Sequence, residues 1–333
     1  MNIKRFLTIG LVALTAFFIA SCKEEDVEYL SLTGAPDFSL PAYGIAGQSF
    51  TFTASGVTDD DGNEVKYYWS ASPIQTAKDT VNTYTVTLTD TLCTVTVTCT
   101  AYADGYYTSS TSRSISIISA DRENGSIKGK TFDTGKDVMF TDPRDGFTYW
   151  CTTIGDKLWF KENLAYTGCG HALEGCDVTA PLFGMYYTWE EARTACPQGW
   201  RVSSLQDWVD AATAVSNQAI GPKDTFYSMA GYFMGDLYFN DEKMWEYWPQ
   251  VKLTNSSGLS LMPAGYANIG ESSPEFDEMY NYSAVWTADE KDEDLAYYRY
   301  IYVEKPDVML GCASKSSFGA SVRCVKDVPV PEE

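Results

Sequence analysis

The residues able to do chemistry in this 333-residue chain are mainly cysteines and carboxylates. It contains nine cysteines, 45 acidic residues and one histidine, His171. A single histidine removes most Ser-His-Asp and Cys-His nucleophile schemes and leaves a zinc site with one imidazole at most. Paired carboxylates could hydrolyse a glycan, although so many acids guarantee chance pairs. We therefore predict no catalytic residue and no cofactor, and look to the cysteines for lipid and disulfide bonds.

Cys22 stands at the end of a segment built for export. A short basic start leads into an uncharged, mostly apolar run over residues 6–20, closed by Ala20-Ser21. The run is shorter than the roughly 18–20 residues of a membrane span, and an ordinary signal peptide or a single membrane helix are the alternatives. The segment resembles a bacterial lipoprotein signal with its lipobox. That resemblance implies a signal peptide over residues 1–21, lipid on Cys22, and a lipidated acidic tether over residues 22–31.

The residues that follow Cys22 bear on location. Lys23-Glu24-Glu25-Asp26 resembles the acidic signal that sends Bacteroidetes lipoproteins to the outside of the outer membrane. The resemblance implies a surface-exposed, lipid-anchored protein of the outer membrane, which contacts the membrane through the Cys22 lipid only. Six of the other cysteines lie beyond residue 150, and an oxidising compartment favours disulfides for them.

The charge and length of the chain exclude some classes of partner. A formal net charge of −21 lacks the Lys/Arg stripes that nucleic acid requires, and it argues against adhesion to anionic lipid through charge. The length suits two domains, and 44% hydrophobic residues supply ordered cores.

Residues 32–120 carry the pattern of an all-β domain. Short stretches that alternate or are β-branched are separated by turn-rich sequence, which predicts about seven strands in a sandwich. The clearest strands are Phe50–Thr53, Val65–Trp69, Tyr84–Thr89, Thr94–Thr98 and Ser114–Ile118. Cys93 and Cys99 fall along one strand, too far apart to pair, and are predicted to be buried thiols. Residues 121–135 are polar and read as a linker.

Two stretches of this domain resemble immunoglobulin-like and polycystic-kidney-type modules. One runs from the acidic turn into Val65-Lys66-Tyr67-Tyr68-Trp69, and the other is Tyr84–Asp90. No cysteine within the segment precedes Trp69 to form an inter-sheet bridge, so the resemblance implies the fold alone. The acidic turn, residues 59–63, does not match a calcium loop and is predicted to be solvated.

Residues 136–327 form a second domain with helices. Thr188 caps a helix over Trp189–Cys196, which Pro197 ends, and Ser204 with Asp207 approximates a capping box for the next helix. The segment resembles the Fibrobacter succinogenes major paralogous domain through motifs in the right order. They include Asp142–Gly146, Ile154-Gly155-Asp156, Tyr186–Trp189, Ala195–Trp200, Met262–Tyr266, Ala284–Thr287, Tyr297-Tyr298-Arg299 and Ser321–Asp327. Residues 328–333 form a C-terminal tail.

The same helices and cysteines also resemble the C-type-lectin-like fold. There, a cysteine that ends the first helix pairs with one on the last strand, which implies Cys196–Cys324 here. Cys169 and Cys176 would then close a short loop, and Cys151 would pair with Cys312, one choice among many. The expected architecture is multidomain: an N-terminal all-β immunoglobulin-like sandwich, then an α+β C-type-lectin-like domain stapled by disulfides.

Other candidate sites in the second domain concern metals and ligands. The calcium motifs of lectins are missing, which leaves Asp289 as a weak calcium candidate and no predicted metal. Cys169, His171 and Cys176 have zinc-type spacing, but the compartment favours a disulfide. Five aromatic residues lie in loop-like sequence and are candidate ligand-binding residues, because their rings could stack on sugars; the alternative is that they pack beneath loops. These are Trp245, Tyr247, Trp248, Tyr280 and Tyr282.

Three functions remain open from the sequence. The first is adhesion or capture, in which the lectin-like domain binds a glycan or a surface or host protein, presented on a β-sandwich stalk. The second is a structural part of a surface assembly or filament. The third is a glycan hydrolase that uses paired carboxylates.

Overall fold

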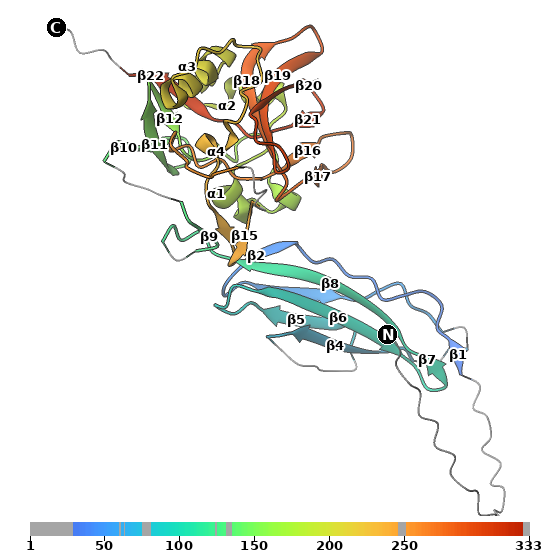
Figure 1. Ribbon diagram of the computed structural model, residues 1–333. Helices are drawn as coiled ribbons and strands as arrows, with labels where there is room; N and C mark the ends of the chain where they lie inside the picture. Colours follow the sequence, from blue (N-terminus) through green and yellow to red (C-terminus); the bar gives the residue numbers. More distant parts are fainter. Residues whose placement is uncertain are drawn as a thin grey trace, which may run out of the picture.

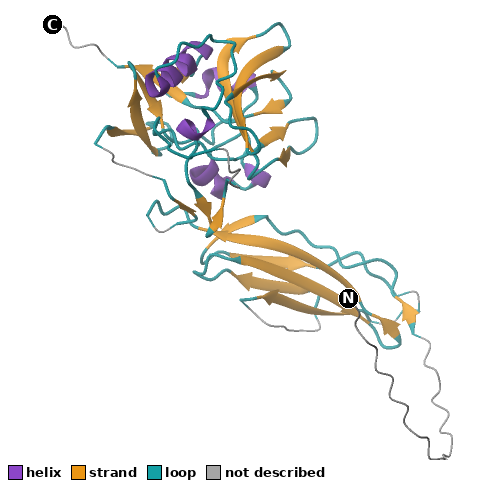
Figure 2. Ribbon diagram, viewed as in Figure 1, coloured by secondary structure: helices purple, strands orange, loops and turns teal. Residues whose placement is uncertain are grey.

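The chain folds into two domains that are rich in β-strands (Figure 1). The computed structural model describes residues 29–59, 61–62, 64–74, 81–123, 125–130, 135–245 and 251–328. The predicted signal peptide and Cys22 lie outside the described residues. We refer to residues 29–120 as the N-terminal domain and to residues 127–328 as the C-terminal domain. Figure 2 shows all drawn helices in the C-terminal domain.

Two sheets form the body of the N-terminal domain. One has the strand order β2-β8-β6-β4, with β2 parallel to β8, and the other pairs β3 with β5. A short β1-β7 pair lies at the end far from the C-terminal domain (Figure 1). The bounds are β1 Leu30–Ser31, β2 Tyr43–Ile45, β3 Ser49–Thr53, β4 Lys66–Ser72, β5 Thr83–Thr87, β6 Thr94–Tyr102, β7 Tyr106–Tyr107 and β8 Ser109–Ile118.

Alternation along the strands builds the core of this domain. In β6 every second side chain is buried, and the intervening threonines face outward. Trp69 lies fully buried between the sheets and stacks on Tyr84, with ring centroids 5.4 Å apart. The five strands expected from the sequence are all present. Cys93 and Cys99 are both free; Cys99 is buried as expected, whereas Cys93 is half-buried.

The C-terminal domain combines four sheets with short helices. The sheet orders are β10-β11-β12-β22-β13, β15-β14-β9, β17-β16-β21 and β18-β19-β20. The first strands are β9 Ile127–Lys128, β10 Asp137–Thr141, β11 Thr148–Ile154, β12 Lys157–Phe160, β13 Arg201–Val202, β14 Tyr238–Phe239 and β15 Glu242–Lys243. They are followed by β16 Tyr266–Asn268, β17 Glu275–Asp277, β18 Tyr282–Glu290, β19 Leu295–Tyr302, β20 Met309–Ser314, β21 Phe318–Gly319 and β22 Cys324–Asp327. β9 comes from the segment expected as a linker.

The two main helices begin where their caps predict. Thr188 and Glu191 form a capping box at the start of α2, and Ser204 and Asp207 form one at the start of α3. Arg201 also donates to the Asp207 carboxylate, which holds β13 against α3. The helices are α1 Ala180–Phe183, α2 Trp189–Ala195, α3 Leu205–Ser216 and α4 Ala230–Phe233, with 3-10 turns at Leu173–Gly175 and Asp177–Thr179.

Arg323 is a fully buried charged side chain at the centre of the C-terminal domain. Its Nε donates to Asn163 Oδ1 at 2.8 Å. Its Nη1 donates to the backbone oxygens of Phe160 at 3.1 Å and Leu259 at 2.9 Å. One guanidinium therefore ties together three segments that are far apart in the sequence.

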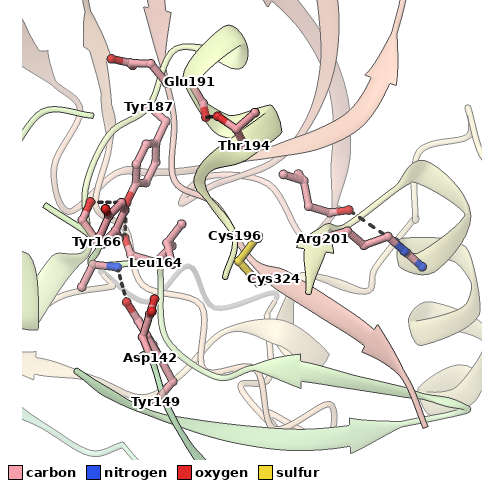
Figure 3. The surroundings of a disulfide bond; sticks show 12 residues. Asp142, Tyr149, Leu164, Tyr166, Tyr187, Glu191, Thr194, Cys196, Arg201 and Cys324 are labelled. Atoms are coloured by element: carbon pink, nitrogen blue, oxygen red, sulfur yellow. Dashed lines mark hydrogen bonds between the residues drawn. A yellow bond between two sulfur atoms is a disulfide. The ribbon is translucent and has the colours of Figure 1, made fainter. Parts of the chain in front are cut away.

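One disulfide closes this domain. Cys196 follows α2, and Cys324 opens β22; their Cα atoms are 5.8 Å apart, and the bond spans 128 residues (Figure 3). The Cys196–Cys324 pair expected from the lectin resemblance is confirmed. It joins the end of the first main helix to the last strand.

The other two expected disulfides are not formed. Cys151 is buried on β11 in the core, whereas Cys312 is exposed on β20, 3.4 Å from Lys291 Nζ. Cys169 packs against the core that contains Tyr149, while the Cys176 thiol contacts the Glu174 backbone oxygen at 3.4 Å. All four thiols are free, because their strands and loops direct them to different surroundings.

An apolar cluster joins the two domains. Ile118 ends β8 and packs, together with Ile127, against Phe183 and Phe239 of the C-terminal domain. The ring of Tyr43 on β2 meets Phe239 edge-on, and burial raises the pKa of Tyr43 to about 12. We call this cluster the domain junction.

Hydrogen bonds reinforce the domain junction. Asn240 Nδ2 donates to the Ile117 backbone oxygen at 3.0 Å, and the Asn240 backbone N–H donates to the Ser126 backbone oxygen at 2.8 Å.

In the part of the chain that the structure describes, no helix has the length and apolar character that a membrane crossing needs.

Candidate functional site

Tyrosines alternate along β19 and share one face of its sheet. Tyr298, Tyr300 and Tyr302 point to this face, while Arg299 and Ile301 point into the domain. The register places Tyr302 opposite Tyr282 on β18. Strand pairing therefore gathers four tyrosine rings on one side of the sheet.

These rings form the floor of an open groove of about 540 Å³. Tyr266 on β16 and Phe318 on β21 supply one wall, so the groove lies where two three-stranded sheets meet. Figure 1 shows β16 to β21 along one side of the C-terminal domain, in orange and red. We call it the tyrosine groove; its lining residues are Tyr266, Asn268, Glu278, Tyr282, Tyr298, Tyr300, Tyr302, Lys305, Met309 and Phe318.

The rings hold one another in place. Tyr282 stacks on Tyr300, with centroids 5.0 Å apart and an interplanar angle of 19°. Tyr266 stacks on Phe318 at 5.2 Å, and Phe318 also lies 5.0 Å from Tyr298. All five rings are half-buried. A ligand would therefore meet a preformed aromatic surface and would pay little side-chain ordering entropy on binding.

The hydroxyl groups of Tyr266, Tyr282 and Tyr298 remain protonated. Tyr282 and Tyr298 share a hydrogen bond of 3.1 Å between their hydroxyls. Burial is the main cause that raises the pKa of Tyr266, of Tyr282 and of Tyr298 above the ordinary tyrosine value. At neutral pH these three tyrosines therefore present neutral phenols, which both donate and accept hydrogen bonds.

Gly311 on β20 lets a ring lie close to the sheet. It stands opposite Tyr298, and a Cβ at this position would lie 2.4 Å from Tyr298 Cζ. Any larger residue would push that ring out of its present position. Gly311 thus sets the depth of the groove floor.

The structure separates the aromatic residues that the sequence suggested as ligand-binding. Tyr282 lines the tyrosine groove. Trp245 does not: it is 1% exposed in the core, and its Nε1 donates to the Leu261 oxygen at 3.0 Å. Tyr280 packs beside the domain junction. Tyr247 and Trp248 lie outside the described residues.

The metal candidates have structural partners. Asp289 Oδ2 accepts a hydrogen bond from the Leu205 backbone N–H at 2.7 Å, so it caps the start of α3. His171 Nε2 lies 3.7 Å from Glu191 Oε1. Among the residues that the structure describes, no three His, Cys, Asp or Glu side chains are placed to hold a metal ion.

A larger hollow of about 860 Å³ lies near the start of the C-terminal domain, but its cations face the protein's own acids. Arg122 and Lys130 each lie 3.5 Å from a Glu162 oxygen. Lys128 Nζ lies 2.5 Å from Asp241. The tyrosine groove, which is lined mostly by aromatic rings, is therefore the stronger candidate site.

The comparisons with known proteins identify the domain that holds the groove. The model of the Fibrobacter succinogenes major domain matches residues 152–326, more than half of the chain. The chain belongs to the Fibrobacter succinogenes major domain family. The match spans Cys196, Cys324 and every residue that lines the tyrosine groove. Neither the search of curated proteins nor the search of solved structures returned a match.

Sequence reasoning missed most of the groove within this Fibrobacter succinogenes major domain. Three of the four tyrosines of β19, Tyr298, Tyr300 and Tyr302, recur at every second position, a pattern that indicates one shared strand face. That signal could have identified Tyr298, Tyr300 and Tyr302. Tyr266 and Phe318 carried no such signal, because their strands approach β19 only through the fold.

Proposed function

We propose that this protein is a lipid-anchored protein of the outer-membrane surface whose C-terminal domain captures a glycan in the tyrosine groove. The groove is the observation that carries the proposal. Sugar rings have an apolar C–H face and polar hydroxyl edges, and the groove matches both with half-buried rings and neutral phenols. Asn268, Glu278 and Lys305 add polar groups at the edge.

Binding is a better fit to the groove than hydrolysis. A two-carboxylate glycosidase needs a pair of acids on either side of the scissile bond. Of the described residues that line the groove, Glu278 is the only acid. The groove is accordingly proposed to retain a glycan and not to cleave it.

The proposal includes finer folds for the two domains. The facing sheets around Trp69 support an immunoglobulin-like N-terminal domain that serves as a stalk. The disulfide from α2 to the last strand supports a C-type-lectin-like C-terminal domain. The sequence around Cys22 supports the lipid anchor.

Removing one ring from the groove should weaken glycan binding. We expect Tyr300→Ala to reduce the affinity for the best ligand on a glycan array about tenfold, which is the loss of roughly 1.4 kcal/mol of stacking energy. Gly311→Ala should weaken binding as well, because it displaces the Tyr298 ring without removing it. Titration calorimetry of the mature chain measures both effects.

The matched control for this experiment is Tyr297→Ala. Tyr297 is on β19 too, but it points away from the groove and does not line it. Equal losses in Tyr297→Ala and Tyr300→Ala would contradict the proposal. A wild-type protein that binds no glycan but binds a protein ligand through Tyr300 would overturn the choice of ligand.

The anchor has its own test. Cys22→Ser should release the protein from the membrane fraction, because the serine cannot accept the thioether-linked lipid. Labelling with radioactive palmitate measures the modification, and protease treatment of intact cells measures exposure. We expect the wild-type C-terminal domain to be digested from intact cells. Protection of that domain in intact cells would refute surface exposure.

A further inference from the structure

The N-terminal domain carries a second patterned surface on the outer face of its four-stranded sheet. Threonines alternate along β6 and face serines on β8. Their hydroxyl oxygens pair across the strands: Thr94–Ser116 at 3.4 Å, Thr96–Ser114 at 3.2 Å, Thr98–Ser112 at 2.8 Å and Thr100–Ser110 at 2.8 Å. Four consecutive pairs form a double row of hydroxyls along the domain.

β4 widens this surface and adds the ring of Tyr68 to that of Tyr102 on β6. Ser70 and Ser72 lie opposite Thr98 and Thr96, and Tyr68 lies opposite Thr100. Tyr68 is 48% exposed, and Tyr102 follows it on the same face. We call the surface the hydroxyl face; its residues are Tyr68, Ser70, Ser72, Thr94, Thr96, Thr98, Thr100, Tyr102, Ser110, Ser112, Ser114 and Ser116. Figure 1 shows β4, β6 and β8 running lengthwise along the domain.

The hydroxyl face is almost free of charge in a strongly acidic protein. β4, β6 and β8 contain no Asp or Glu, although the chain has 45 acids. Lys66 stands at one end of the face, and Arg113 points to the other side of the sheet, where it pairs with Asp37. Exposed sheet faces usually carry charges that keep the protein soluble and separate. A face without them suits a neutral partner.

We propose that the hydroxyl face is a second binding surface and that it takes a neutral polysaccharide. The Tyr68 ring can stack on the apolar side of a sugar. Each hydroxyl pair uses one O–H internally, so one donor and several lone pairs remain for sugar hydroxyls. A polyanion would find only Lys66 to pair with. A second copy of the chain would find two rings and no apolar core of the kind that stable protein interfaces require.

The two binding surfaces are independent, because the tyrosine groove is in the other domain. The experiment is co-sedimentation of the mature chain with microcrystalline cellulose, insoluble mannan and insoluble starch, each at several protein concentrations. We expect at least one of these neutral polysaccharides to retain the protein. Tyr68→Ala and Thr98→Glu should each lower the association constant at least fivefold, and they should do so equally in a Tyr300→Ala background, in which the tyrosine groove is impaired.

Controls separate this effect from misfolding. Tyr107, on β7, is 62% exposed and lies outside the hydroxyl face, so Tyr107→Ala should bind as the wild type does. Thr98→Val keeps the shape of the side chain without its hydroxyl and should weaken binding less than Thr98→Glu. Three results would overturn the proposal: no retention by any of the three polysaccharides, retention that Tyr68→Ala and Thr98→Glu leave intact, or dimerisation in solution that Thr98→Glu abolishes. If Tyr300→Ala lost binding while Tyr68→Ala and Thr98→Glu kept it, the retention would be assigned to the groove and the proposal would fail.

Discussion

Arg323→Met is expected to destabilise the C-terminal domain by about 3–5 kcal/mol. The substitution keeps an unbranched side chain of similar length but removes every donor. Asn163 Oδ1 and the backbone oxygens of Phe160 and Leu259 would then be buried without their partner. Each unpaired buried acceptor costs about 1–3 kcal/mol. Chemical denaturation of the mature chain, followed by tryptophan fluorescence, measures the change in unfolding free energy.

Arg193→Met is the matched control for Arg323→Met. Arg193 is on α2, where its guanidinium pairs with Glu190 and both side chains are 55% exposed. An exposed pair of this kind contributes less than about 1 kcal/mol. If the two substitutions lowered the unfolding free energy by similar amounts, the hydrogen bonds of Arg323 would not stabilise the domain as proposed.

Opening the disulfide is expected to have the largest effect of all. Without the bond, the unfolded chain gains the freedom of a 128-residue loop, which is worth about 5 kcal/mol in the chain-entropy view. The Cys196→Ala/Cys324→Ala variant should therefore unfold roughly 10–20 °C below the wild type. Calorimetry of the variant, and of the wild type in reductant, measures the shift.

The free thiols supply the control for this prediction. Cys312→Ser changes an exposed thiol that takes part in no disulfide, and its melting temperature should equal that of the wild type. Reductant should not lower the melting temperature of the double variant any further. If reductant left the melting temperature of the wild-type protein unchanged, the disulfide would not stabilise the fold.

Local signals predicted the two main helices and the longer strands of the N-terminal domain. The caps of α2 and α3 depend on side chains within three residues of each other, and both were readable from the sequence. The strands of the N-terminal domain follow a period of two, which needs no knowledge of their partners. The resemblance to the C-type-lectin-like fold added the Cys196–Cys324 pair, which the structure contains.

The groove and the core could not be separated by local signals. Trp245 stands in loop-like sequence, yet its indole is buried in the core and donates to the Leu261 backbone oxygen. Tyr266, Tyr282 and Phe318 meet only when three strands from two sheets come together. Cysteine pairing also depended on the fold, since Cys151 and Cys312 ended on a buried and an exposed strand.

The domain junction has a mechanical consequence. β8 runs from the far end of the N-terminal domain to Ile118 in the junction, paired with β6 over most of its length (Figure 1). A force that pulls the C-terminal domain away from residue 29 would therefore act along β8 and load its hydrogen bonds with β2 and β6 together, in shear. Strands loaded in this way resist separation far better than strands that are peeled apart one bond at a time. The pairing of β8 is thus suited to resisting a force that acts along its length.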